Sequence, residues 1–190
     1  MKPFAYKKAV QALNYFAIQS GGTINKMKAL KLIWLADRYH LRNYGRTITG
    51  DNYFAMKNGP VASATKDVLN DSSFLDDAAS KYAYDYICEQ SIHHYKSIHS
   101  CVNKVFSKTD LEAITTAFEL YGDEEHFNLS EFSHEFEEWK KHKFTLESPH
   151  ISRVNMSFDD FFSSGVDDKK MFDQSEEKLS AVKDYYLAHN

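Results

Sequence analysis

The chain has few of the residues that build turn-rich or disulfide-linked folds. Its 190 residues include three Pro, seven Gly and two Cys. So few Pro and Gly disfavour an all-β sandwich with many tight turns and favour a mainly helical chain. The two cysteines, Cys88 and Cys101, are too few for a disulfide framework, so we expect free thiols in a reducing compartment.

Long apolar runs are also missing. No stretch approaches the roughly 18 apolar residues that a membrane-spanning helix needs. The first residues, Met1-Lys2-Pro3-Phe4, contain no apolar segment of the kind found in signal peptides. We therefore expect a cytoplasmic protein that has no membrane partner.

Motifs for catalysis and cofactor binding are absent from the sequence. It contains no Cys-x-x-Cys pair, no His-Glu-x-x-His, no Gly-x-Ser-x-Gly and no glycine-rich phosphate loop. The densest group of metal-ligand types, His93, His94, His99 and Cys101, lacks the spacing of a zinc site. We expect no metal, no cofactor and no catalytic residue. A cleft lined by His134 and Asp37, with a strongly perturbed carboxylate, would instead indicate an enzyme.

Apolar and aromatic residues, by contrast, are plentiful. The hydrophobic fraction is 43%, with 14 Phe and 12 Tyr. This is enough for the core of one domain. We expect a single compact α+β domain, predominantly α-helical, with a buried central helix and small β-hairpin elements. Residues 1–145 should form the main unit, and residues 146–190 a C-terminal extension packed on the same domain.

The most informative segment is a predicted helix that begins after Thr23 or Asn25 and runs to about Asn43. Its apolar residues cover almost the whole circumference, which is typical of a central, buried helix. The helical period places Asp37 among these apolar residues. A carboxylate in that position should be paired or hydrogen-bonded, because burying it alone would cost several kcal/mol.

The polar residues of this helix form a narrow basic stripe of Lys28, Lys31, Arg38 and Arg42. Residues 1–50 hold nine Lys or Arg and one acid, whereas residues 119–138 hold eight acids and no Lys or Arg. The stripe is a candidate partner-binding surface. It could equally be an exposed edge without a function, or pair with the acids of residues 119–138.

Two turn motifs flank a short predicted strand at Tyr53–Met56. Gly50-Asp51 indicates a backbone position that favours glycine, followed by an acceptor for nearby backbone donors. Gly59-Pro60-Val61 predicts a sharp turn with proline at the first position of a helix. Alternating residues from Tyr82 to His99 predict a β-hairpin further on.

A predicted helix over residues 130–141 contains His134 and Trp139. Trp139 is expected in the core. His134 is expected near the core, hydrogen-bonded to a neighbouring element.

These segments resemble the Panacea domain of SocA-like antitoxins. The resemblance begins with Lys31-Leu32-Ile33-Trp34-Leu35-Ala36-Asp37-Arg38 and continues through Gly45-Arg46-Thr47-Ile48-Thr49-Gly50-Asp51. It includes Tyr53-Phe54-Ala55-Met56, Gly59-Pro60-Val61, Phe106-Ser107 and the block from Leu129-Ser130 to His134 and Trp139. It covers residues 5–145. The sequence departs from the family before Trp139, where Phe136-Glu137-Glu138 stand in place of an expected Pro or Ala.

The resemblance implies an antitoxin that works by protein–protein contact and is not an enzyme. Its partner would be a cognate toxin, and some similar proteins act as proteolytic adaptors for an ATP-dependent protease. Similar proteins also occur in phages and mobile elements. The competing interpretation, less favoured because the pI is about 6.1, is a nucleic-acid-binding regulator of a mobile-element or phage operon.

The family-motif residues are interpreted chiefly as scaffold, and three surfaces are candidates for partner contact. The motif residues are Asp37, Gly50, Asp51, Tyr53, Gly59, Pro60, Val61, His134 and Trp139. The candidate surfaces are the basic stripe, the acidic 119–138 segment and an aromatic-rich tail with Phe158, Phe161, Phe162, Tyr185 and Tyr186.

Overall fold

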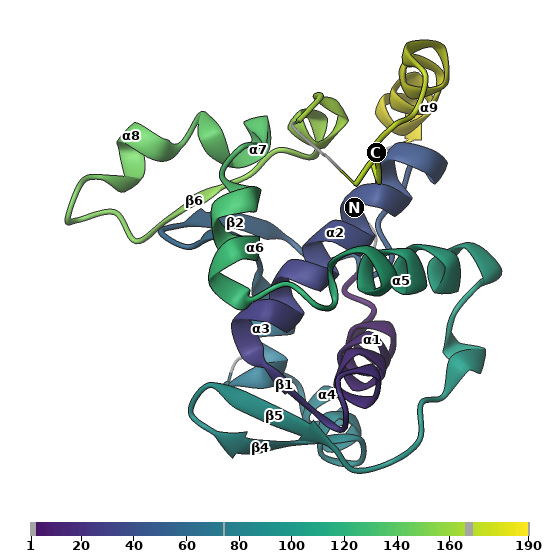
Figure 1. The fold of residues 1–190 in the computed structure, drawn as a ribbon, viewed down its shortest axis with the longest axis vertical. Coiled ribbons are helices and arrows are strands. Elements are labelled where there is room, and N and C mark those ends of the chain that lie inside the picture. The colour runs from purple at the N-terminus through teal and green to yellow at the C-terminus, as the bar shows by residue number, and fades with distance from the viewer. Residues whose placement is uncertain (1–2, 74, 166–168, 190) are drawn as a thin grey trace.

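The computed structural model describes residues 3–73, 75–165 and 169–189. Most of its regular structure is helical, with two small antiparallel sheets (Figure 1). The α-helices are α1 Tyr6–Gln19, α2 Lys26–Tyr44, α3 Ser63–Leu69, α4 Asp77–Tyr84, α5 Lys108–Tyr121, α6 His126–Ser133, α7 Glu137–Lys140, α8 Lys143–Leu146 and α9 Glu176–His189. The strands are β1 Thr23–Asn25, β2 Tyr53–Met56, β3 Gly59–Ala62, β4 Ile87–Ser91, β5 His94–Ser97 and β6 Arg153–Asn155. Short 3-10 helices, η1 Asn103–Val105 and η2 Phe158–Phe162, complete the chain.

Helix α2 runs through the centre of the molecule, and α1, α5 and α6 pack around it (Figure 1). It begins at Lys26 because the Asn25 side chain accepts hydrogen bonds from the amides of Met27 and Lys28. Residues 29–38 are buried without interruption. The predicted central, buried helix is therefore confirmed.

The two sheets lie on different sides of α2 (Figure 1). One has the strand order β1-β5-β4 and the other β3-β2-β6. The predicted hairpin after residue 82 is present as β4 and β5, but Tyr82 and Tyr84 belong to α4 instead of a strand. Asp76 caps that helix at the Ala79 amide. The alternation in the sequence hid the inward spacing of Ala79 and Ala83 on the helix.

The prediction that Pro60 begins a helix is wrong. Met56 pairs with Gly59 across a two-residue hairpin turn, so Gly59-Pro60-Val61 belongs to strand β3. Pro60 is tolerated there because β3 is an edge strand, where a missing N–H removes no ladder bond. Helix α3 begins only at Ser63.

The prediction of a single helix over residues 130–141 is also wrong, because the helical structure is interrupted between α6 and α7. Phe136, in the break, is fully buried. Its ring packs edge-on against Trp34 of α2 at a centroid distance of 5.1 Å. In a continuous helix the turn at Phe136, which places this ring against Trp34, would be absent. Burial of the large aromatic side chain outweighs the few helical hydrogen bonds that the interruption costs.

Gly59 lies where the fold leaves no room for a side chain. Its φ is +96°, and an added Cβ would lie 2.1 Å from Ser133 Oγ and 2.4 Å from Lys31 Nζ. Gly22 has nearly the same φ, +99°, but an added Cβ there would meet nothing within 4 Å. A substitution at Gly22 would therefore cause backbone strain alone, whereas the same substitution at Gly59 would cause both backbone strain and steric overlap.

We predict that Gly59→Ala lowers the free energy of unfolding by about 2–5 kcal/mol, because strain and overlap add. Gly22→Ala, the matched control, should cost only about 1–2 kcal/mol of strain. Urea unfolding of both variants measures the difference. Equal losses for the two variants would contradict the close contact at Gly59.

Candidate functional site

The segment between α2 and β2 is held in place by one buried carboxylate. Asp37 of α2 is fully buried. It accepts hydrogen bonds from the Ile48 amide at 2.7 Å, the Thr49 amide at 3.1 Å and the Tyr53 hydroxyl at 2.8 Å. The Thr49 hydroxyl donates a further bond. The expectation that Asp37 is hydrogen-bonded is confirmed.

Burial changes the ionisation of this carboxyl group. Removal from water raises the pKa of Asp37 to about 6, although hydrogen bonds from Thr49, Tyr53 and Ile48 act in the opposite direction. Neither Asp37 nor His134 lines the cavity of about 750 Å³ beside Lys8 and Arg46 or the cavity of about 210 Å³ beside β4. Asp37 directs its carboxylate at the loop that follows α2.

Asp51 plays a similar part at the start of α3. Its carboxylate accepts bonds from the Ala64 amide at 2.9 Å and from the Thr65 amide and hydroxyl at 2.7 Å each. The predicted acceptor for backbone donors is therefore present. Gly50, just before it, has a φ of +63°, which agrees with the predicted preference for glycine at this turn. Burial raises the pKa of Asp51.

Lys31 and the β2–β3 hairpin form a second buried contact. The Lys31 ammonium donates a 2.9 Å bond to the Pro60 carbonyl. Only 1% of the Lys31 surface is exposed. This burial lowers the pKa of Lys31 to about 7, because the charged form loses its hydration.

Arg38 is buried in an ion pair with an acid of the 119–138 segment. Its Nε lies 2.7 Å from Glu138 Oε1, and neither side chain is exposed. The guanidinium group packs between the rings of Phe136 and Phe172, at 4.5 and 4.4 Å from their centroids. Of the three interpretations of the basic stripe, pairing with the acidic segment is confirmed for Arg38.

Arg42 is covered by residues from the end of the chain. It donates to the carbonyls of Phe161 at 3.0 Å and Ser163 at 2.9 Å. Arg38 also donates to the Ser163 carbonyl, at 2.6 Å. Because Lys31, Arg38 and Arg42 are buried, only Lys28 of the stripe is partly exposed. An accessible surface made of all four side chains does not exist in the described chain, and partner binding by Lys28 stays a prediction.

His134 and Trp139 lie against each other, with ring centroids 3.7 Å apart and planes inclined by 15°. Trp139 is buried, as expected, and its Nε1 donates to the Met56 carbonyl at 2.8 Å. The expected hydrogen bond from His134 to a neighbouring element is not found at Nε2, which has no partner among the described residues. Stacking on Trp139 is the main contact of this ring.

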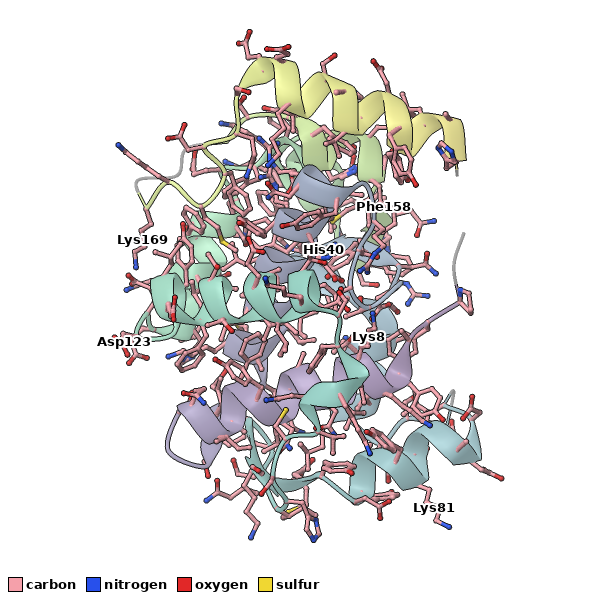
Figure 2. All side chains as sticks on the ribbon, turned by 90° about the vertical axis from the view of Figure 1, so that its right-hand side faces the viewer. Lys8, His40, Lys81, Asp123, Phe158 and Lys169 are labelled. Atoms are coloured by element: carbon pink, nitrogen blue, oxygen red, sulfur yellow. The ribbon has the colours of Figure 1, made fainter. Side chains whose placement is uncertain are left out.

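The acidic segment and the aromatic tail are only partly available as surfaces. Glu138 is buried, and Glu124 lies 2.6 Å from Lys169, whereas Asp123 remains exposed (Figure 2). In the tail, Phe161 and Phe162 are buried in the core, while 55% of Tyr185 is exposed. Partner contact through the exposed parts stays a prediction.

A cluster of charged groups around Asp110 was missed in the sequence. Asp110 Oδ2 accepts from Lys8 Nζ at 2.6 Å, and Oδ1 lies 2.8 Å from Arg46 Nη2 and 3.2 Å from His40 Nε2. The Ser107 amide donates a capping-box bond at 2.9 Å. The only sequence signal was the Ser107-x-x-Asp110 spacing, which predicts a helix start and says nothing of residues 64 to 102 positions away.

The Asp110 cluster shifts the ionisation of its members in predictable directions. Although burial opposes ionisation, hydrogen bonds from Lys8, Ser107 and Arg46 lower the pKa of Asp110 to about 2. Burial lowers the pKa of His40 to about 4. At neutral pH the cluster therefore contains two cations, one carboxylate and a neutral imidazole.

A cavity of about 750 Å³ opens beside this cluster. In Figure 2, Lys8, His40 and Phe158 follow one another from the middle of the molecule towards α9. The cavity is lined by the end of α2, the 44–48 and 50–51 segments, residues 157–159 and the end of α9, with Lys8 and Arg46 on its wall. Its lining combines charged side chains, such as Lys8 and Asp51, with aromatic rings, such as those of Tyr44 and Phe158.

Two further kinds of site can be assessed in the described part of the chain. There, no three His, Cys, Asp or Glu side chains are grouped as metal ligands would be. None of the helices in residues 3–73, 75–165 and 169–189 has the length and apolar character needed to cross a membrane.

The raised pKa of Asp37 predicts a specific pH dependence. The native carboxyl group binds its proton more tightly than the unfolded one does. Its contribution to stability is therefore fully present below about pH 4 and is lost as the pH rises through about 6. Asp37→Asn keeps an acceptor but does not titrate. Relative to the original chain, the variant should gain about 2 kcal/mol in free energy of unfolding between pH 4 and 7.

Urea unfolding of both proteins at the two pH values measures this gain. The contribution of His40, which has the opposite sign because its pKa is lowered, is common to both proteins and cancels in the difference. Asp123→Asn, at an exposed position, is the control for removal of a charge as such. A difference that does not change between pH 4 and 7 would show that Asp37 is not the titrating group.

Comparison with known proteins assigns the family. The family model of the antitoxin SocA-like, Panacea domain matches residues 30–140, more than half of the chain. No curated protein and no solved structure matches the chain. The matched range contains the Asp37 and Asp51 networks, the β2–β3 hairpin, the Asp110 side chain and the His134–Trp139 pair. The chain therefore belongs to the SocA-like antitoxin family that is defined by the Panacea domain.

Proposed function

We propose that this chain is the antitoxin of a toxin–antitoxin pair and neutralises a cognate toxin by direct protein–protein contact in the cytoplasm. The match to the Panacea domain over residues 30–140 is the observation that supports this most strongly. The proposal includes a non-enzymatic mechanism. Delivery of the bound toxin to an ATP-dependent protease is the second step that we propose for it.

The motif side chains form hydrogen bonds and ion pairs within their own chain, and this supports a binding function over catalysis. Asp37 and Asp51 direct their carboxylates at backbone and hydroxyl donors of their own chain. Lys31 and Arg38 are likewise engaged with Pro60 and Glu138. A scaffold built in this way keeps its loops and edges in fixed positions, from which a partner can be bound with little ordering cost.

The first test is co-expression with the product of the adjacent gene. We expect that product to arrest growth alone, and co-expression to restore growth and yield a complex that co-purifies. Gly59→Ala, which disturbs the fold without removing a surface side chain, is the control that should restore growth less well.

Further outcomes separate masking from delivery to a protease. Rescue that persists in a protease-deficient host indicates masking, and rescue that is lost there indicates delivery. If the adjacent product is not toxic, or if no complex forms, the antitoxin proposal is wrong.

A nucleic-acid-binding regulator remains the alternative proposal, and burial of three stripe residues weakens it. Lys31, Arg38 and Arg42 place their charges inside the protein, whereas phosphate contacts need accessible cations. If the alternative were correct, affinity for operator DNA should fall steeply with salt and fall again in Lys28→Gln. Binding that is absent, or does not change with salt, would exclude it.

A further inference from the structure

Strand β4 forms an outer edge of its sheet. The strand order is β1-β5-β4, so β4 pairs on one side only, with β5 (Figure 1). Within the described residues no strand lies beyond it. Unpaired backbone groups on such an edge can accept a strand from another chain.

The register shows which backbone groups are unpaired. The Ile98 amide donates to the Tyr86 carbonyl at 2.9 Å, so the Tyr86 carbonyl faces β5, whereas the Tyr86 amide donates to the Ala83 carbonyl at 3.0 Å. In an antiparallel ladder the bonded pairs alternate, which makes Cys88 and Lys96 the next bonded pair. The N–H and C=O groups of Ile87 and Glu89 therefore point away from β5. Among the described residues they have no backbone partner on that outer side.

A small cavity of about 210 Å³ adjoins this edge. Three consecutive β4 residues line it: Ile87, Cys88 and Glu89. Alternate side chains of a strand point to opposite faces, so backbone atoms of the strand form part of the cavity wall. The other walls come from α3, from α4, from Asp71 and Leu75 between these helices, and from Tyr95 of β5, and they are largely apolar.

The charged residues that line the cavity are acidic, although one of them, Glu89, already forms a 2.7 Å ion pair with Lys26 of α2. Asp71 and Glu89 are its charged lining residues, and both are acidic. A complementary segment would place an apolar side chain in the cavity and a Lys or Arg beside it. A second copy of this chain fits less well, because pairing two β4 edges would bring two sets of acidic groups together.

We propose that β4 binds an extended segment of the toxin as an additional strand. The outward groups of Ile87 and Glu89 supply the main-chain hydrogen bonds, and the adjoining cavity receives an apolar side chain flanked by a basic residue. The usable edge is short, because the register shifts between Glu89 and Ser91. The inference rests on the proposed function, because it assigns the segment to the toxin.

Hydrogen exchange at single residues tests the main-chain contact. In the free chain, the amide of the exposed residue Glu89 should exchange quickly and that of Cys88 slowly, because Cys88 is bonded to β5. The Ile87 amide gives no such contrast, because only 5% of Ile87 is exposed. In the complex, exchange of the Glu89 amide should slow roughly tenfold, while the Cys88 amide stays protected in both states.

Variants at one position test the same contact by affinity. Glu89→Pro removes the outward N–H, at an edge position where the β4–β5 ladder does not use that group. Glu89→Ala is the matched control, because both variants lose the 2.7 Å ion pair with Lys26 but only one loses the donor. We expect Glu89→Pro to bind the toxin roughly tenfold more weakly than Glu89→Ala. Glu89→Lys should also bind more weakly than Glu89→Ala, because it repels a basic segment.

The outcomes distinguish this inference from the proposed function. If the toxin is bound and neutralised while Glu89→Pro matches Glu89→Ala and the Glu89 amide stays unprotected, the inference alone is wrong. Protection of the Glu89 amide in the isolated chain at high concentration would indicate a second copy and would also overturn the inference. If no complex forms with the original chain, the proposed function fails and the inference fails with it.

Discussion

The structure depends on the need to satisfy polar groups on a helix that is covered on all sides. Helix α2 contributes Lys31, Asp37, Arg38 and Arg42 to the interior. Buried charged groups without partners cost several kcal/mol each, so every one of them requires a specific segment of the chain at a specific place. Lys31 holds the β2–β3 hairpin, Asp37 holds the loop that follows α2, and Arg38 and Arg42 hold the last third of the chain.

These contacts explain why the family motif is read best as scaffold. Asp51 acts in the same way, because its carboxylate accepts hydrogen bonds from the first amides of α3 and so links the turn at residues 50–51 to this helix. Fixed loops and edges are what a protein needs when its function is to present a surface. The motif residues therefore hold the β2–β3 hairpin, the loop after α2 and the start of α3 in fixed positions.

The last part of the chain is connected to the family domain by hydrogen bonds to its carbonyl groups as well as by packing. Residue Ser163 accepts hydrogen bonds from both Arg38 and Arg42. Phe172 lies on the guanidinium group of Arg38. Because these residues lie beyond the range matched by the family model, this chain uses family residues to secure a segment that the family model does not describe.

The sequence by itself determined the helical class, the central buried helix, the Asp37 acceptor and the Asp51 turn. These features depend on local periodicity and on the chemistry of single residues, and both can be read along the chain. Only the tertiary structure decided that Lys31, Arg38 and Arg42 are buried, that Pro60 lies in a strand, and that Phe136 interrupts a helix. It also brought Lys8, His40, Arg46 and Asp110 together. Pro60 pairs locally, with Ala55 of the same hairpin. Each of the other outcomes depends on a partner far away in the sequence, and neither periodicity nor spacing specifies which distant segment will cover a given face of a helix.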